Sequence, residues 1–97
     1  MDELEFEWNP LKAEANERKH GVSFEEAESV FYDEYARLIP DPDHSIGEER
    51  FILLGVSEIS RLLTVVHLYK GSDRMIRIIS ARPATKQERH QYEEFLP

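Results

Sequence analysis

The chain has 97 residues, which is long enough for one compact domain spanning 1–97 and too short for two. Hydrophobic residues make up 40% and charged residues 33%, a balance typical of a globular domain. No stretch has the roughly 20 apolar residues that span a bilayer, and the acidic start lacks a secretory signal, so we expect a cytoplasmic protein with no membrane partner. The sequence has no cysteine, which excludes disulfides, a thiol nucleophile and cysteine-ligated metals.

Acidic and basic residues are distributed unevenly along the chain. The formal net charge is −8, yet residues 61–97 carry seven basic and four acidic residues, whereas residues 1–60 carry five basic and sixteen acidic ones. This asymmetry predicts a basic surface built mainly from the later segment. A solvated charge pattern with no partner is the alternative, and composition alone favours it.

Capping residues predict three helix starts. Asn9 before a proline predicts a helix that runs to about His20, where Gly21 provides a left-handed stop. Two capping boxes predict a second helix after Ser23 and a C-terminal helix after Thr85. The inner face of the C-terminal helix is expected to consist of Tyr92, Phe95 and Leu96.

Segments rich in Val, Ile, Leu and aromatic residues predict the sheet. Three of them, at residues 50–57, 62–69 and 75–82, are joined by short turns and predict an antiparallel meander. Residues 36–39 predict a fourth strand, and residues 5–8 can add a short edge strand. Two helices, a meander of three to four strands and a C-terminal helix together predict an α+β fold with helices packed on one antiparallel sheet.

The first predicted helix carries a polar face. Lys12, Asn16, Lys19 and His20 recur at helical spacing and gather toward its C-terminal end. Such residues can form a patch that binds phosphate or transfers protons. Favourable interaction of the cationic groups with the helix dipole is the structural alternative, and spacing alone favours it.

Arginines in and beside the strands are candidates for phosphate binding. Strict alternation along the last strand places Met75, Arg77, Ile79 and Ala81 on one face and Arg74, Ile76, Ile78, Ser80 and Arg82 on the other. Arg77, with apolar neighbours on its own face, can offer a planar fork to a phosphate, and Arg50 and Arg61 can converge with it. An internal ion pair with Glu49 or another acidic residue is an equally favoured alternative.

Other chemistries find little support in the sequence. The four histidines are not paired at metal-ligand spacing, so no metal site is predicted, and His67 is expected to be a hydrogen-bonded core histidine. A glycine-rich phosphate loop and a serine in a nucleophile-elbow context are both missing, which disfavours kinase chemistry and hydride transfer. No cofactor is expected.

Several segments occur in an order that matches a known family. They are residues 6–10 (FEWNP), Lys12, Asn16, residues 19–27 (KHGVSFEEA), residues 43–45 (DHS), residues 48–50 (EER), residues 76–84 (IRIISARPA), Glu88, Arg89 and Tyr92. Together they closely resemble BrnT-type toxins over nearly the whole chain. The resemblance implies a ribonuclease toxin of a type II toxin–antitoxin pair with a RelE/ParE-like fold. It also implies an RNA substrate and a BrnA-like antitoxin that dimerises through a ribbon-helix-helix domain and makes the DNA contacts.

On this basis we expect a metal-independent endoribonuclease, in which the 2′-hydroxyl of the RNA attacks the adjacent phosphate. The expected catalytic residues are Lys19, His20, Glu49, Arg50, Arg77 and Arg82. His20 or Lys19 would serve as acid or base. The arginines would stabilise charge, and Glu49 would orient an arginine or act as the base.

Four further residues are expected to contact the RNA: Lys12, Asn16, Arg61 and Tyr92. Tyr92 could stack on a base, although its place on an inner helix face favours core packing. The alternative function is that of a non-catalytic interaction protein that keeps the antitoxin-binding surface but has lost RNA cleavage. The net charge of −8 fits that alternative, as does Pro83, which interrupts the basic run usual in the toxins that this chain resembles.

Overall fold

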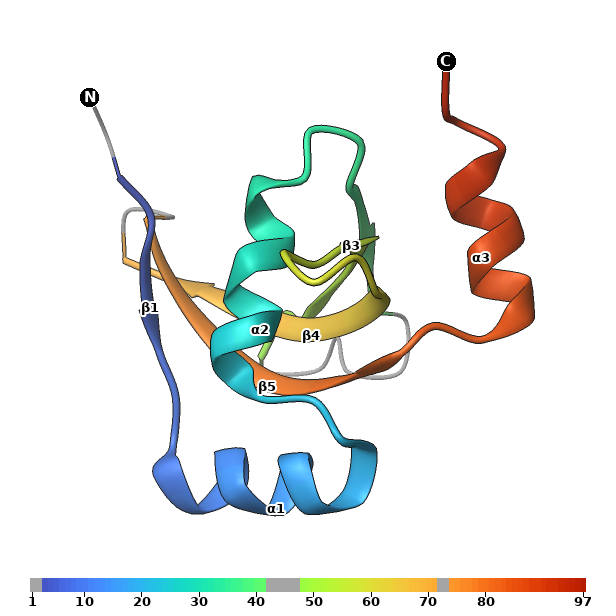
Figure 1. The fold of residues 1–97 in the computed structure, drawn as a ribbon. Helices are drawn as coiled ribbons and strands as arrows, with labels where there is room; N and C mark the ends of the chain where they lie inside the picture. Colours follow the sequence, from blue (N-terminus) through green and yellow to red (C-terminus); the bar gives the residue numbers. More distant parts are fainter. Residues whose placement is uncertain (1–2, 42–47, 72–73) are drawn as a thin grey trace.

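The computed structural model describes residues 3–41, 48–71 and 74–97 (Figure 1). Residues 43–45 of the toxin resemblance lie outside the described residues. The elements follow in the order β1 (Glu5–Glu7), α1 (Pro10–His20), α2 (Phe24–Ser29), a 3₁₀ turn η1 (Val30–Tyr32), β2 (Arg37–Pro40), β3 (Phe51–Val56), β4 (Leu62–Lys70), β5 (Met75–Pro83) and α3 (Lys86–Glu93).

The five strands form one sheet in the order β1-β5-β4-β3-β2. The pairs β2–β3, β3–β4 and β4–β5 are antiparallel, which confirms the predicted meander and its fourth strand. The prediction of a wholly antiparallel sheet is wrong at one edge, because β1 pairs with β5 in parallel. Since β4 occupies one side of β5, the short β1 adds to the other side, where its direction matches that of β5.

The predicted capping residues begin each helix. Asn9 Oδ1 accepts hydrogen bonds from the backbone N–H groups of Leu11 and Lys12 at 2.9 and 3.2 Å. Gly21 ends α1 with a φ of 70°, a left-handed conformation that favours glycine. Ser23 caps α2 by accepting from the N–H of Glu26, but the Glu26 carboxylate binds Arg61 and Ser57, so the predicted capping box is only half formed there. The reciprocal capping box predicted after Thr85 is present at α3. These local signals are confirmed because each of them satisfies backbone groups within a single turn.

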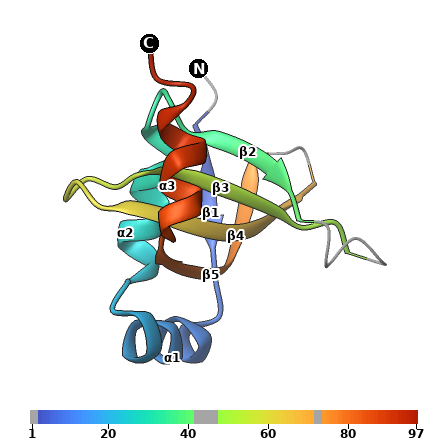
Figure 2. The ribbon, with the colours of Figure 1, turned by 90° about the vertical axis from the view of Figure 1, so that its right-hand side faces the viewer.

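Helices cover both faces of the sheet. Side chains of α2 and η1 join those of the strands in the main core on one face, whereas Tyr92 of α3 packs with Leu54 and Leu62 on the other. The neighbouring residues Leu53 and Leu54 of β3 illustrate this arrangement, since each belongs to a different core. Figures 1 and 2 accordingly show β3 and β4 running between α2 and α3.

The predicted inner face of the C-terminal helix is partly wrong. Tyr92 is buried, but Phe95 and Leu96 are 60% and 41% exposed. Helix α3 ends at Glu93, so these two side chains follow the helix and do not continue its buried face. Phe95 instead lies under the guanidinium of Arg37 of β2, with 3.5 Å between the guanidinium carbon and the ring centroid.

Candidate functional site

Helix α1 lies against an edge of β5 that β1 leaves free. Strand β1 pairs only with residues 75–77 of β5. Farther along β5, the side-chain amide of Asn16 of α1 pairs with the backbone of Ala81 as a neighbouring strand would. Its Nδ2 donates to the carbonyl of Ala81 at 2.8 Å, and its Oδ1 accepts from the N–H of Ala81 at 3.1 Å. Nδ2 also donates to the carbonyl of Val22 at 3.0 Å. Asn16 is 8% exposed, so these bonds are buried and fix α1 on the sheet.

The polar face of α1 opens onto a hollow of about 250 Å³ beside β5. Six of the residues that line it belong to the predicted patch or to the adjoining strand: Lys12, Asn16, Lys19, His20, Ile79 and Ser80. Helical spacing puts the four α1 residues on one face, and the Asn16–Ala81 pairing brings that face to the strand. The structure therefore assembles the predicted patch of α1 around the middle of β5.

A β-bulge in β5 determines which way its arginines face. Val66 of β4 pairs with Ser80, but His67 pairs with Ile78, so Ile79 has no partner in the register. Ile78 and Ala81, three residues apart, are consequently both buried in the α2-side core. The strict alternation predicted for this strand is wrong beyond the bulge.

This bulge brings Arg77 and Arg82 to the same face of the sheet. Arg77 precedes Ile78 and Arg82 follows Ala81, and both of those neighbours point into the α2-side core. Both arginines therefore project toward the α3 side. From Ser80, at the α1 hollow, Arg82 lies on the order of 7 Å along the strand in one direction and Arg77 on the order of 10 Å in the other.

Arg82 is held by a glutamate from α3. Its Nη1 and Nη2 donate to the two carboxylate oxygens of Glu88 at 2.8 and 3.0 Å. Burial raises the pKa of Glu88, but hydrogen bonds from Arg82, from the N–H of Thr85 and from Thr64 outweigh it and lower that pKa to about 2. The same hydrogen bond raises the pKa of Arg82. The pair is thus fully ionised at neutral pH.

Arg77 is held by a different acid, Glu7 of β1. Register places the two residues side by side, and Arg77 Nη1 donates to Glu7 Oε2 at 2.7 Å. Lys70 Nζ donates to the same oxygen at 3.1 Å. Hydrogen bonds from Arg77 and then Lys70 lower the pKa of Glu7. Arg77 therefore forms the internal ion pair that is the alternative to phosphate binding, and its partner is Glu7.

Arg50 and Glu49 lie just before β3. Arg50 Nη2 is 3.1 Å from Glu48 Oε1, and Glu49 is exposed. Because Phe51 pairs with His67, the adjoining Arg50 lies across from Leu68, which itself pairs with Arg77. Two strand spacings therefore separate the backbones of Arg50 and Arg77, on the order of 10 Å.

Arg61 is held by an acid in the first turn of α2. Its guanidinium pairs with Glu26, which Nε contacts at 2.9 Å, and Nη2 donates to the carbonyl of Gly21 at 3.0 Å. Ser57 also donates to Glu26, at 2.7 Å. The Arg61 bond lowers the pKa of Glu26 despite its burial. Arg61 thereby ties the β3–β4 turn to α2.

Tyr92 packs between α3 and the sheet, as its inner-face position favoured. It is buried, and its hydroxyl donates to Asp33 Oδ2 at 2.7 Å. Burial and the neighbouring Asp33 raise the pKa of Tyr92 to about 12. These contacts occupy the hydroxyl in holding α3.

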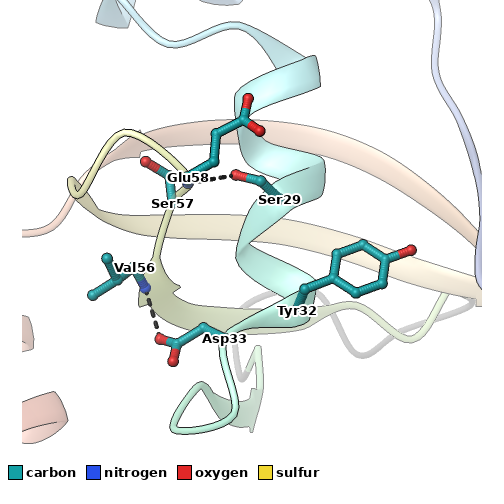
Figure 3. A pocket seen from close by; sticks show the side chains of 6 residues that line it. All are labelled: Ser29, Tyr32, Asp33, Val56, Ser57 and Glu58. Atoms are coloured by element: carbon teal, nitrogen blue, oxygen red, sulfur yellow. Dashed lines mark hydrogen bonds between the residues drawn. The ribbon is translucent and has the colours of Figure 1, made fainter.

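A second hollow, of about 410 Å³, has a different chemical character (Figure 3). It lies between the 3₁₀ turn and the β3–β4 hairpin, and the residues lining it are Ser29, Tyr32, Asp33, Val56, Ser57 and Glu58. Figure 3 shows Asp33 bonded to the N–H of Val56 and Ser29 bonded to the N–H of Glu58. Two of the lining residues, Asp33 and Glu58, carry carboxylates, and such an acidic surface repels phosphate.

His67 belongs to the core, which confirms the prediction. It is fully buried, and its ring nitrogens lie 3.2 Å from the carbonyl of Val65 and 3.3 Å from the hydroxyl of Tyr69. Burial lowers its pKa to about 4. In residues 3–41, 48–71 and 74–97 no three His, Asp or Glu side chains are grouped so as to hold a metal ion.

Glu7, Lys70 and Glu88 are not among the site residues predicted from the sequence. Glu88 could have been found from two signals together, because a capping-box glutamate that follows a basic strand lies within reach of that strand. Glu7 and Lys70 gave no such local signal, since their partnership depends on the parallel pairing of β1 with β5.

Comparisons with known proteins agree with this fold. The family model described as "Ribonuclease toxin, BrnT, of type II toxin-antitoxin system" matches residues 8–88. The crystal structure of the Brucella abortus ribonuclease toxin BrnT superposes with a TM-score of 0.66 at 22% identity, covering 86% of this chain and 99% of that one. No curated protein matches. Among the described residues, no helix is long and apolar enough to cross a membrane. The chain belongs to the BrnT family of ribonuclease toxins of type II toxin–antitoxin systems.

Proposed function

We propose that this chain cleaves RNA without a metal ion, by attack of a 2′-hydroxyl on the adjacent phosphate. The observation that carries the proposal is the arrangement around β5. A hollow lined by Lys12, Lys19 and His20 lies at the middle of the strand, and two arginines flank that position on one face. Cationic donors spaced over about 10–20 Å suit consecutive phosphates of a single strand.

Each group has a chemical role in this mechanism. His20 or Lys19 removes the proton of the 2′-hydroxyl or supplies one to the leaving oxygen. Arg82 stabilises the negative charge that grows on the oxygens of the phosphate that is cleaved. Arg77, about 17 Å away along β5, binds a neighbouring phosphate of the same strand. Arg50 extends the cationic track, and Glu49 is the alternative base. Lys12 contacts a flanking phosphate.

The test uses purified protein and a 5′-labelled RNA in EDTA. We expect fragments that end in a 2′,3′-cyclic phosphate, because the attacking oxygen belongs to the RNA. RNA carrying 2′-O-methyl groups throughout should remain intact. Cleavage of the methylated RNA, or cleavage that requires added Mg²⁺, would contradict the mechanism.

Variants locate the reaction on the protein. His20→Ala and Arg82→Ala should each slow cleavage, the latter by roughly 10²–10³-fold if one charge-stabilising donor is lost. Arg18→Ala is the matched control, because Arg18 lies on α1, is exposed and pairs with Glu14 outside the hollow. Equal cleavage rates for all three variants would show that the reaction does not take place beside β5.

The partner we propose is a BrnA-like antitoxin with a ribbon-helix-helix domain, which dimerises and makes the DNA contacts. On the α3 side of the sheet, Ile39, Ile52 and Val66 are only half-buried and lie beside the arginines. An acidic, amphipathic antitoxin segment complements such a surface. Co-expression with such an antitoxin should give a complex in the cytoplasm with two toxins per antitoxin dimer, measured by light scattering. Separate elution at micromolar concentration would argue against it.

One observation favours a second function, that of a binding protein without catalysis. Arg50, Arg77 and Arg82 pair with the carboxylates of Glu48, Glu7 and Glu88, respectively. Each pairing reduces the positive potential offered to RNA. Intact RNA over a wide range of protein concentration, together with a stable antitoxin complex, would support this function.

A further inference from the structure

Glu88 of α3 collects hydrogen bonds from three parts of the chain. Its Oε1 accepts from the hydroxyl of Thr64 on β4 at 2.9 Å and from the N–H of Thr85 at the helix start at 2.8 Å. Both oxygens also accept from Arg82 of β5. The capping box and Thr64 therefore fix the position of the carboxylate independently of Arg82.

The pairing leaves part of Arg82 accessible. The side chain of Glu88 is 20% exposed, whereas that of Arg82 is 39% exposed. A bidentate pair fixes the plane of a guanidinium, and a flexible arginine otherwise loses rotamer entropy when it binds a phosphate. The accessible part of Arg82 is therefore presented to the surface in a defined orientation.

We infer that Glu88 is the positioning residue for Arg82, fixing its guanidinium to contact the phosphate that is cleaved. The inference rests on the proposed function, because it requires Arg82 to act on RNA. It assigns to α3 a part in the site that the predicted catalytic residues do not include. The helix start supplies the carboxylate, and its hydrogen bond from Thr64 of β4 sets where Arg82 lies.

Arg77 provides a contrast on the same strand. Only one of its nitrogens donates to Glu7, and the same carboxylate oxygen also accepts from Lys70. Glu7 is not part of a capping box. Removing the Glu7 carboxylate should therefore disturb the orientation of the Arg77 guanidinium less than removing the Glu88 carboxylate disturbs that of Arg82. Accordingly, Glu7→Gln should reduce cleavage less than Glu88→Gln does.

Two other roles for Glu88 make different predictions. A carboxylate that competes with RNA for Arg82 would make RNA bind more tightly when its charge is removed. If the carboxylate only holds α3 in place, removing it would lower the stability of the protein. Its effect on cleavage would then be the same whether or not Arg82 is present. Thr64 and the N–H of Thr85 hold Glu88 independently of Arg82, which argues against displacement of Glu88 by a phosphate.

The experiment is a double-mutant cycle with Glu88→Gln, Arg82→Ala and the double variant. Glutamine is chosen because it can still form a capping box and retain the helix start. Single-turnover cleavage over a range of protein concentrations separates the maximal rate from half-saturation, and 2′-O-methyl RNA measures binding alone. Thermal unfolding is recorded for every variant.

Two control variants separate positioning from stability. Glu93→Gln removes the same charge from the exposed side of α3. Asp33→Asn weakens the bond to Tyr92, and so loosens the helix at its other end without touching Arg82. Both controls should cleave as fast as the unaltered protein, although Asp33→Asn should melt at a lower temperature.

We expect Glu88→Gln to lower the maximal rate by about 10–100-fold, with half-saturation changed by less than about threefold. The double variant should be no slower than Arg82→Ala. Tighter RNA binding by Glu88→Gln, additive losses in the double variant, or unimpaired cleavage by Glu88→Gln would each overturn the inference while Arg82→Ala stays slow. If Arg82→Ala cleaves normally, or the unaltered protein does not cleave, the proposed function fails first and the inference fails with it.

Discussion

Asn16 and Ala81 lie 65 positions apart in the chain, yet the side-chain amide of the first pairs with both backbone polar groups of the second. The pairing satisfies the edge of β5 at Ala81, beyond the part that β1 covers, and an unpaired edge would invite another strand. It also sets the polar face of α1 against the strand. One buried amide therefore both completes the sheet and forms the hollow.

Replacing Asn16 with alanine should lower the free energy of unfolding by roughly 1–3 kcal/mol, because buried backbone groups of Ala81 and Val22 lose their partners. Urea unfolding measures the change. Glu17→Ala, on the exposed side of the same helix, should stay within about 0.5 kcal/mol of the unaltered protein. If both substitutions cost the same, the amide does not hold the edge.

How far the sequence predicts this protein depends on how local each signal is. Capping residues and turn lengths concern neighbours in the chain, so the helix starts and the antiparallel meander were predicted within a residue or two. The bulge at Ile79 depends on how β5 fits β4, and alternation alone placed Arg77 and Arg82 on opposite faces. The pairing of Glu7 with Arg77 required knowledge that β1 joins β5 in parallel.

Acidification should destabilise the protein through His67. Burial lowers its pKa from 6.5 in the unfolded chain to about 4 in the folded protein, so between these pH values the unfolded chain binds a proton that the folded protein does not. The contribution of neutral His67 to the free energy of unfolding is fully present above about pH 6.5. It is lost as the pH falls toward 4, and the total loss is roughly 3 kcal/mol. Urea unfolding at pH 4, 5, 6 and 7 measures it.

His67→Phe should flatten the pH dependence in this window, because phenylalanine suits the ring contacts with Phe31, Phe51 and Tyr69 but does not titrate. His90→Gln, on the exposed surface of α3, is the control and should keep the slope. A slope that persists in His67→Phe would assign the effect to other groups.

A second acid transition is expected from Glu88. Its pKa falls from 4.5 in the unfolded chain to about 2 in the folded protein, so its contribution to stability is present above about pH 4.5 and is lost as the pH falls through 2. Glu88→Gln should therefore be less stable than the unaltered protein at pH 6, with the difference shrinking toward pH 2. Unfolding by urea across this range provides the measurement. A difference that is constant with pH would mean that the ionised carboxylate is not what Arg82 stabilises.

Lys19 and Arg18 are adjacent on α1 and provide the sharpest test of where RNA binds. Lys19 lines the hollow beside β5, whereas Arg18 is exposed and pairs with Glu14. Lys19→Ala should weaken binding of 2′-O-methyl RNA and reduce by about 0.7 the slope of log affinity against log salt, since one phosphate contact to a single strand is lost. Arg18→Ala should change neither value appreciably, because Arg18 lies outside the hollow. Both residues are exposed, so melting temperatures should agree within a few degrees and exclude unfolding as the cause. Equal losses of affinity in the two variants would indicate a diffuse attraction to the whole helix instead of a contact in the hollow.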